Sequence, residues 1–219
     1  MQVLNCTTPA NFFHALRRQL KRDFRIPMVV FTPKSLLRHP KCVSKLDDLA
    51  SGGFKEIIDD ENTDRESVKR IVFCSGKIYY DLLARKEELD ARDVAIIRVE
   101  QLHPFPKNQI LELVKTYPNA LLNLWVQEEP ENMGPWYYVE NQIPELKLVP
   151  VARLASVSPA TGLNGLHVVG QKEIIGKVFK KCHCALKNDY CGLQCVEGKS
   201  RAEILKQHKY FESPQRFSI

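Results

Sequence analysis

The sequence contains no long hydrophobic run. No window of its 219 residues approaches the roughly 18 consecutive apolar residues that a helix needs to cross a bilayer. The N-terminus, Met-Gln-Val-Leu-Asn-Cys-Thr-Thr-Pro, has neither the basic n-region nor the apolar h-region of a secretory signal, and it lacks the Arg- and Ser-rich composition of an organellar transit segment. We therefore expect a soluble protein without a membrane partner.

A concentration of charge of one sign is also missing. The 32 lysines and arginines are interspersed with 26 aspartates and glutamates, and a net charge of +6 without a basic stripe is not typical of a nucleic-acid surface. A glycine-rich phosphate loop is absent too, because Ser75-Gly76-Lys77 falls far short of the pattern G-x-x-x-x-G-K-[ST]. We expect no nucleic-acid partner and interpret Gly76 as part of a tight turn.

The cysteines do not form a recognisable framework. Without a secretory signal a reducing compartment is the default, and Cys74, at the end of an apolar run, is interpreted as a small buried hydrophobe. Five side chains near the C-terminus have the chemistry of zinc ligands: Cys182, His183, Cys184, Cys191 and Cys195. Their C-x-C and C-x₃-C spacings differ from the favoured C-x₂-C pairs, so we predict no metal and interpret this segment as an unpacked extension.

Three short, continuous apolar runs rich in β-branched residues dominate the middle of the chain: Ile71–Cys74, Val94–Val99 and Leu122–Val126. Such runs are typical of strands that are covered on both faces. Apolar residues at helical spacing separate them, between Ile78 and Leu89 and between Ile110 and Val114. Two successive strand–helix–strand units predict an α/β fold with a mostly parallel, doubly wound sheet.

The N-terminal part predicts one helix and one strand. Thr8 and Pro9 suit an N-cap and a first helical position, and the strand extends over Pro27–Pro33. We expect the apolar stripe of the helix to face the core: Phe12, Phe13, Leu16 and Leu20. Its basic face is interpreted as solvated, with anion or membrane binding as the alternative. One helix and one strand cannot form a sheet alone, so we expect the chain to open within a domain whose other strands lie upstream.

Further elements are expected on either side of the central runs. Ser44–Ala50 predicts a short helix and Phe54–Ile58 an edge strand, within a linker between two domains. Leu148–Ala155 predicts another strand, and Gln171–Phe179 a closing helix.

Two groups of polar residues are candidates for chemistry. Glu128 and Glu129 follow a strand whose carboxyl end would face a ligand crevice, but neighbouring strand residues point to opposite faces, so a catalytic dyad is not expected. Lys34, Ser35 and Arg38 are suited to binding a phosphate or carboxylate.

Several motifs together resemble one family. The segment up to about residue 179 resembles the C-terminal part of the thiamine-diphosphate-dependent 2-oxoglutarate dehydrogenase component. The motifs that carry the resemblance are Pro-Lys-Ser-Leu-Leu-Arg-His-Pro (33–40), Cys-Ser-Gly-Lys-Ile-Tyr-Tyr-Asp-Leu-Leu (74–83), Asp-Val-Ala-Ile-Ile-Arg-Val-Glu-Gln-Leu (93–102), Pro-Phe-Pro (104–106), Trp-Val-Gln-Glu-Glu-Pro (125–130) and Asn-Met-Gly-Pro-Trp (132–136).

The resemblance implies a transketolase-like architecture. Residues 1–32 would end a pyrimidine-binding domain, residues 33–67 would be a linker, residues 68–180 would form the transketolase C-terminal domain, and residues 181–219 would be an atypical tail. The diphosphate and Mg²⁺ motif and the catalytic residues of the family lie upstream of the part that this chain matches. We therefore expect no catalytic and no cofactor-binding residues here, and no activity from this chain alone.

The resemblance also implies the function of the whole enzyme. That enzyme, an oxidoreductase of the tricarboxylic acid cycle, decarboxylates 2-oxoglutarate on thiamine diphosphate with Mg²⁺ and passes succinyl to a lipoyl arm. Its implied partners are a second copy, the upstream domains and the lipoyl-bearing succinyltransferase, in bacterial cytoplasm or the mitochondrial matrix. Some members bind AMP or acetyl-CoA near the domain junction, which makes Arg18, Lys34 and Arg38 candidate anion contacts. Two alternatives remain: a stand-alone regulatory or interaction module, and a metal-binding module formed by the tail.

Overall fold

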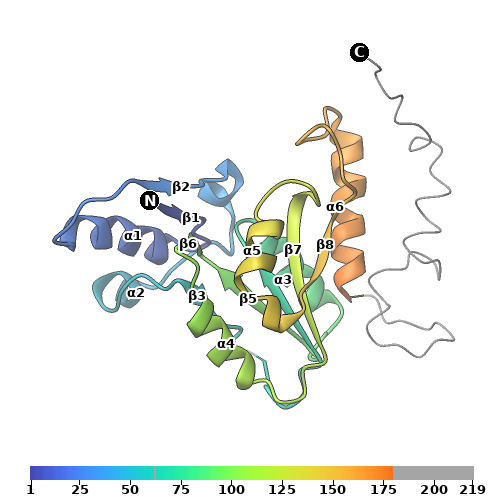
Figure 1. The fold of residues 1–219 in the computed structure, drawn as a ribbon, viewed down its shortest axis with the longest axis horizontal. Coiled ribbons are helices and arrows are strands. Elements are labelled where there is room, and N and C mark those ends of the chain that lie inside the picture. The colour runs from blue at the N-terminus through green and yellow to red at the C-terminus, as the bar shows by residue number, and fades with distance from the viewer. Residues whose placement is uncertain (62, 180–219) are drawn as a thin grey trace, which may run out of the picture. The chain divides into compact units, whose positions relative to one another are not determined.

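The computed structural model describes residues 1–61 and 63–179 (Figure 1), which form two β-sheets flanked by helices. One sheet has the strand order β3-β5-β4-β7-β8 and the other the order β2-β1-β6. The strands are β1 Gln2–Leu4, β2 Met28–Val30, β3 Ile57–Ile58, β4 Arg70–Cys74, β5 Val94–Val99, β6 Gln101–His103, β7 Leu122–Pro130 and β8 Val149–Arg153. The helices are α1 Pro9–Lys21, η1 Lys34–Arg38, α2 Leu46–Ala50, α3 Ile78–Glu88, α4 Lys107–Lys115, α5 Trp136–Gln142, η2 Pro144–Leu146 and α6 Asn164–Phe179.

The larger sheet confirms the predicted α/β class. β4 is central and pairs in parallel with both β5 and β7, β7 pairs in parallel with β8, and only β3 is antiparallel. Alternate residues of a strand face opposite sides, and both sides are covered here. Phe73 and Trp125 share a buried cluster with Ile110 of α4 and Trp136 of α5. Helices α3 and α6 pack against each other and against this sheet (Figure 1).

The smaller sheet corrects the expectation that the N-terminal strand has no partner in this chain. Gln2–Leu4, which the sequence did not predict as a strand, pairs in parallel with β2, and α1 connects the two. β6 pairs antiparallel with β1 on its other side. Because β6 follows β5 after a single residue, the chain passes directly from the larger sheet into the smaller one. A strand of three residues is too short to show a periodic pattern, which is why it was missed.

Helix α1 begins as predicted but faces the other way. Thr8 accepts the Asn11 backbone N–H through its hydroxyl, and Pro9 is the first helical residue. The expected core stripe, Phe12, Phe13, Leu16 and Leu20, is between 38% and 75% exposed. The side that packs inward consists of the small and polar residues Ala10, Asn11, His14 and Ala15. Helix α1 is amphipathic as predicted, but the described part of the chain does not cover its apolar stripe.

The remaining elements agree with the predictions in type and differ in extent. The short helix covers Leu46–Ala50, and the edge strand is reduced to Ile57–Ile58. Helix α6 begins at Asn164, seven residues before the predicted start, because Gly165, Gly170 and the β-branched pair between them hide its pattern. None of the described helices is long and apolar enough to cross a membrane.

Candidate functional site

A buried carboxylate lies where the chain crosses between the two sheets. Glu100 is fully buried between β5 and β6. Its two oxygens accept hydrogen bonds from the Thr7 backbone N–H (2.8 Å), the Thr7 hydroxyl (2.5 Å) and the Asn11 side-chain amide (2.9 Å). These donors belong to the start of α1 and the segment before it. Glu100 therefore fixes the N-terminal segment to the larger sheet.

Arg98 and Tyr80 complete this buried cluster. The Arg98 guanidinium donates to the Thr7 hydroxyl (3.0 Å) and lies 4.3 Å from the centre of the Tyr79 ring. The Tyr80 hydroxyl donates to the Thr7 carbonyl. Burial raises the pKa of Glu100, and the hydrogen bonds from Thr7 and Asn11 and the charge of Arg98 act in the opposite direction. Every group around the carboxylate is thus a donor or a cation, as a buried acceptor requires.

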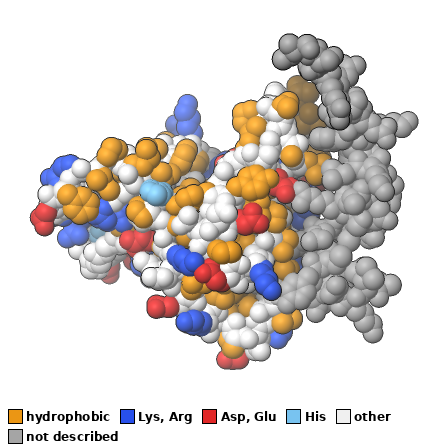
Figure 2. Space-filling model, in the orientation of Figure 1, with side chains coloured by type: hydrophobic (Ala, Val, Ile, Leu, Met, Phe, Trp, Pro, Cys, Tyr) orange, Lys and Arg blue, Asp and Glu red, His pale blue; other side chains and the backbone are white. Residues whose placement is uncertain are grey.

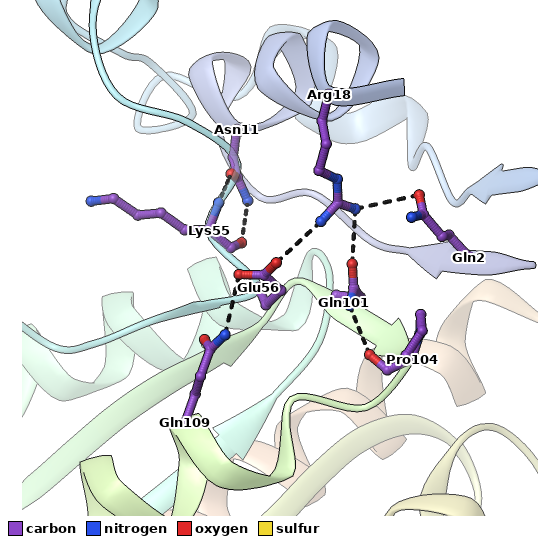
Figure 3. A network of polar contacts seen from close by, with 8 residues as sticks. All are labelled: Gln2, Asn11, Arg18, Lys55, Glu56, Gln101, Pro104 and Gln109. Atoms are coloured by element: carbon purple, nitrogen blue, oxygen red, sulfur yellow. Dashed lines mark hydrogen bonds and ion pairs between the residues drawn. The ribbon is translucent and has the colours of Figure 1, made fainter. Parts of the chain in front are cut away.

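A second polar network surrounds Arg18, one of the three candidate anion contacts (Figure 3). Its guanidinium donates to Glu56 (3.2 Å) and to Gln101 (2.8 Å), and it lies 3.9 Å from the centre of the Phe54 ring. Gln101 in turn donates to the Pro104 carbonyl (2.7 Å). The Arg18 side chain is only 14% exposed, and burial lowers its pKa. Arg18 therefore joins α1 to the segment before β3 and to β6.

The other two candidate anion contacts lie elsewhere. Lys34 and Arg38 are at the two ends of η1, and both are exposed. Within residues 1–61 and 63–179, neither forms an ion pair or a side-chain hydrogen bond, and no contact joins either of them to Arg18. Arg18 is therefore bound within its own chain, whereas Lys34 and Arg38 remain available to an external anion.

Side chains of the protein itself contact each other across the carboxyl edge of the larger sheet. Chain connections from β4 and β7 diverge here, which is where doubly wound sheets bind ligands. An ion pair between Lys77, after β4, and Glu128, in β7, spans this point. Gly76 has a φ of +76°, and a Cβ there would lie 2.4 Å from the Asn5 side-chain nitrogen. The predicted tight turn at Gly76 therefore lets the Asn5 side chain lie directly against the backbone.

The end of β7 and the turn that follows it are held by contacts within the chain. Trp136 is buried, and its backbone N–H donates to the Gln127 side chain (3.1 Å). Gln127 also accepts from the Trp125 indole (3.0 Å) and donates to the Met133 carbonyl (2.7 Å). Glu129 is exposed, whereas Glu128 pairs with Lys77. One buried amide, Gln127, therefore holds this turn, and no sequence pattern identifies it beforehand.

Cysteine and metal chemistry is limited in the described residues. Cys74 is fully buried as predicted, and burial raises the pKa of its thiol to about 12. No cluster of three or more His, Cys, Asp or Glu side chains within residues 1–61 and 63–179 is arranged to hold a metal ion. The C-terminal zinc candidates, from Cys182 to Cys195, lie outside the described residues.

Sequence reasoning did not identify Glu100 as a key residue. Its one signal is a carboxylate directly after a mostly apolar run that ends at Val99, since an acid there has to be paired or exposed. Its partners, Thr7 and Asn11, are about ninety positions away in the sequence. The pairing of β6 with β1 brings them together.

Comparisons with known proteins find one group of relatives. The family model described as 2-oxoglutarate dehydrogenase C-terminal matches residues 43–179. The chain is 47% identical over 187 residues to the 2-oxoglutarate dehydrogenase E1 component of Cupriavidus necator, covering 83% of this chain and 20% of that protein. It is 46% identical over 188 residues to the mitochondrial 2-oxoglutarate dehydrogenase of Caenorhabditis elegans, covering 81% of this chain and 18% of that protein.

A third relative carries a different substrate in its name. The chain is 44% identical over 186 residues to the 2-oxoadipate dehydrogenase complex component E1 of Rattus norvegicus, covering 82% of this chain and 20% of that protein. The chain thus spans about a fifth of the length of the curated relatives that it matches. The family match covers more than half of this chain and includes the whole of the larger sheet. The chain belongs to the 2-oxoglutarate dehydrogenase C-terminal family.

Proposed function

We propose that this chain is the C-terminal part of a 2-oxo acid dehydrogenase E1 component that acts on 2-oxoglutarate. The similarity to E1 components over at least four-fifths of the chain carries this proposal. The proposed enzyme decarboxylates 2-oxoglutarate and transfers succinyl to the lipoyl arm of a succinyltransferase. Relatives from bacteria and from mitochondria suggest bacterial cytoplasm or the mitochondrial matrix as its compartment. The transketolase-like domain boundaries at residues 32, 67 and 180 belong to the same proposal.

The described residues do not fit a binding site for thiamine diphosphate and Mg²⁺. They contain no cluster of acidic or histidine side chains for the metal. The glycine turn at Gly76, where a strand meets a helix, is occupied by Asn5. Thiamine diphosphate supplies the carbanion chemistry of such enzymes. We therefore place the cofactor in the remaining four-fifths of the E1 polypeptide and assign it no contact here.

The role we assign to this chain is structural: it packs against the rest of the enzyme. Large apolar side chains are exposed on α1, β2 and the adjoining segments, and Figure 2 shows hydrophobic side chains gathered around β2. The exposed set comprises Phe13, Leu16, Leu20, Phe24, Val29 and Phe31. A group of large exposed apolar side chains of this kind indicates an interface. We propose that the remaining E1 polypeptide covers it, within a homodimer.

The regulatory anion site remains a separate proposal. Lys34 and Arg38 are available for a phosphate, whereas Arg18 would first have to leave Glu56 and Gln101. Calorimetric titration of acetyl-CoA and AMP into the wild type and into Lys34→Ala, Arg38→Ala and Arg18→Ala tests it. Binding that is lost in the first two variants supports the site. Equal heats in all four proteins reject it.

Reconstitution tests the main proposal. We expect no decarboxylation by this chain alone, and 2-oxoglutarate decarboxylation when it is mixed with the remaining part of the E1 polypeptide. Parallel assays with 2-oxoadipate separate the two substrates that the relatives are named for. Turnover by the isolated chain would overturn the proposal, and stable binding to another protein without any restored turnover would favour a stand-alone interaction module.

A further inference from the structure

Positive charge is concentrated in the N-terminal part of the chain, which corrects the expectation of an even mixture. Residues 1–46 contain nine lysines and arginines and a single acidic residue, Asp23, whereas residues 47–179 contain 15 basic and 21 acidic residues. The first range includes α1 and β2, where large apolar side chains are exposed, and Lys and Arg side chains border hydrophobic ones at this end of the molecule (Figure 2). The N-terminal part therefore combines exposed apolar side chains with a surplus of cations.

Two of these cations lie beside the apolar stripe of α1. Arg17 and Lys21 are one helical turn apart, so they share one side of the helix. The exposed apolar side chains Phe13, Leu16 and Leu20 also repeat at helical spacing. Because successive residues are about 100° apart around a helix axis, Arg17 and Lys21 border this stripe on one side. We call these two residues the positive flank of α1.

The positive flank has no compensating acid in the part of the chain that the structure describes. Arg17 and Lys21 are exposed, and neither forms an ion pair or a side-chain hydrogen bond with another described residue. Arg18, between them, differs: it is mostly buried and donates to Glu56 and Gln101. The flank is therefore available to carboxylates of a partner that packs on the apolar stripe.

The exposed apolar surfaces of a second copy of this chain do not supply these carboxylates. Contact between the α1 helices of two copies would add a second apolar stripe but no acid, because α1 contains no acidic residue. Another group of exposed apolar side chains, which includes Leu163, Leu166 and Val169, lies at the start of α6. Residues 154–170 contain no acidic residue either. The matching surface has to come from a different polypeptide segment.

We propose that an acidic amphipathic helix of the remaining E1 polypeptide covers α1. Exposed apolar side chains at helical spacing form ridges that pack into the grooves of another helix, as Phe13, Leu16 and Leu20 do on α1. Asp or Glu side chains beside the apolar face of the covering helix would pair with Arg17 and Lys21. Such pairs at the rim determine register and orientation more than affinity. Because the partner is the remaining E1 polypeptide, this inference rests on the proposed function.

Charge reversal on α1 tests the inference with the whole chain. We expect Arg17→Glu with Lys21→Glu to weaken binding to the remaining E1 polypeptide at least tenfold in calorimetric titration, since it places like charges in contact. Added salt should weaken the binding of the wild type more than that of this variant. Lys69→Glu with Lys115→Glu makes the same change of net charge at exposed positions outside residues 1–46 and should bind like the wild type. Circular dichroism checks that both double variants fold.

The possible results separate this inference from the proposed function. If the wild type does not bind the remaining E1 polypeptide, the proposed function fails and the inference fails with it. If the wild type and the α1 variant bind equally well and with the same salt dependence, only the acidic covering helix is refuted. Arg17→Gln with Lys21→Gln removes the charge without reversing it, so it should show the same loss of salt dependence in a helix without new acids.

An anionic membrane is the alternative partner for a basic amphipathic helix. Vesicles of phosphatidylglycerol, with phosphatidylcholine vesicles as the reference without net charge, test it in a sedimentation assay. We expect the whole chain to bind neither. Sedimentation with phosphatidylglycerol that is lost in Arg17→Glu with Lys21→Glu, while binding to the remaining E1 polypeptide is unchanged, would assign the positive flank to a membrane surface and overturn the inference.

Discussion

A single carboxylate determines how the start of α1 is attached to the larger sheet. Glu100 is fully buried, and each of its three hydrogen bonds comes from Thr7 or Asn11. Removing a buried acceptor leaves its donors without a partner, which costs more than the hydrogen bond itself contributes. The residue therefore matters for the geometry between the two sheets more than its lone position in the sequence suggests.

Replacing Glu100 should distinguish hydrogen bonding from charge. Glu100→Ala leaves the Thr7 backbone N–H and the Asn11 amide without an acceptor, and we expect it to lower the free energy of unfolding by about 2–4 kcal/mol. Glu100→Gln keeps an oxygen for both donors and should cost less than half as much. Urea unfolding followed by circular dichroism measures both values. Equal losses in the two variants would show that charge, and not hydrogen bonding, is the main contribution.

The pH dependence of stability tests the same residue. Burial raises the pKa of Glu100 in the folded protein above its ordinary value of 4.5. Between pH 4.5 and the raised pKa of the folded protein, Glu100 binds a proton in the folded state but not in the unfolded state. Stability therefore falls as pH rises through this window. Glu100→Gln cannot titrate there. We expect the free energy of unfolding of the wild type, minus that of the variant, to decrease from pH 4.5 upward and then level off; an increase would contradict the prediction.

At the scale of elements, we expect replacement of glycine by alanine to have opposite effects on stability at two positions. Gly76 has a positive φ and lies against Asn5, so Gly76→Ala should destabilise the protein by about 1–3 kcal/mol. Gly176 is inside α6, and a Cβ there meets nothing within 4 Å. Gly176→Ala should therefore stabilise the protein by about 0.5–1 kcal/mol. Thermal unfolding of the two variants measures both, and a shift of the same sign in both would refute the assignment of their environments.

The sequence predicted the elements whose pattern is local. β4, β5 and the first half of β7 are mostly apolar and rich in β-branched residues, which predicts burial on both faces. The orientation of α1 was predicted wrongly, because its large apolar stripe is not the side that packs inward. The polar side of a helix becomes the buried one only when a specific partner exists, as Glu100 does for Asn11 and Gln101 does for Arg18. Such partners are set by strand pairing over long sequence distances, which periodicity does not report.

The same reasoning applies to the candidate sites. The carboxyl edge of the sheet and the turn at Gly76 could be located from the sequence, but not the Lys77–Glu128 ion pair that closes this edge. Lys34 and Arg38 were named from residue type alone, and the structure leaves both exposed. The positive flank of α1 was interpreted as solvated and opposite a buried apolar stripe, but it borders an exposed stripe. Helical periodicity gives the spacing of the two sides and not which of them is covered.

At the scale of the whole molecule, the two sheets share one continuous stretch of chain. β5 belongs to the larger sheet and β6 to the smaller one, with only Glu100 between them. The Arg18 network adds a second connection through Glu56 and Gln101. The smaller sheet consequently has a fixed relation to the larger one, while α1 presents apolar side chains outward. This arrangement suits a segment that positions a docking surface for another part of the enzyme.

Charged substitutions on the exposed apolar side of α1 should impair assembly with the rest of the enzyme while leaving the folding of this chain nearly unchanged. Leu16 and Leu20 are 46% and 75% exposed on α1, so Leu16→Asp with Leu20→Asp should change the free energy of unfolding of this chain by less than about 1 kcal/mol. The same pair should reduce reconstituted 2-oxoglutarate decarboxylation at least tenfold, because two charges would be buried in an apolar interface. Leu121→Asp, at a position that is 49% exposed before β7, is the control and should reconstitute normally. If the double variant assembles and turns over like the control, the rest of the enzyme does not cover α1.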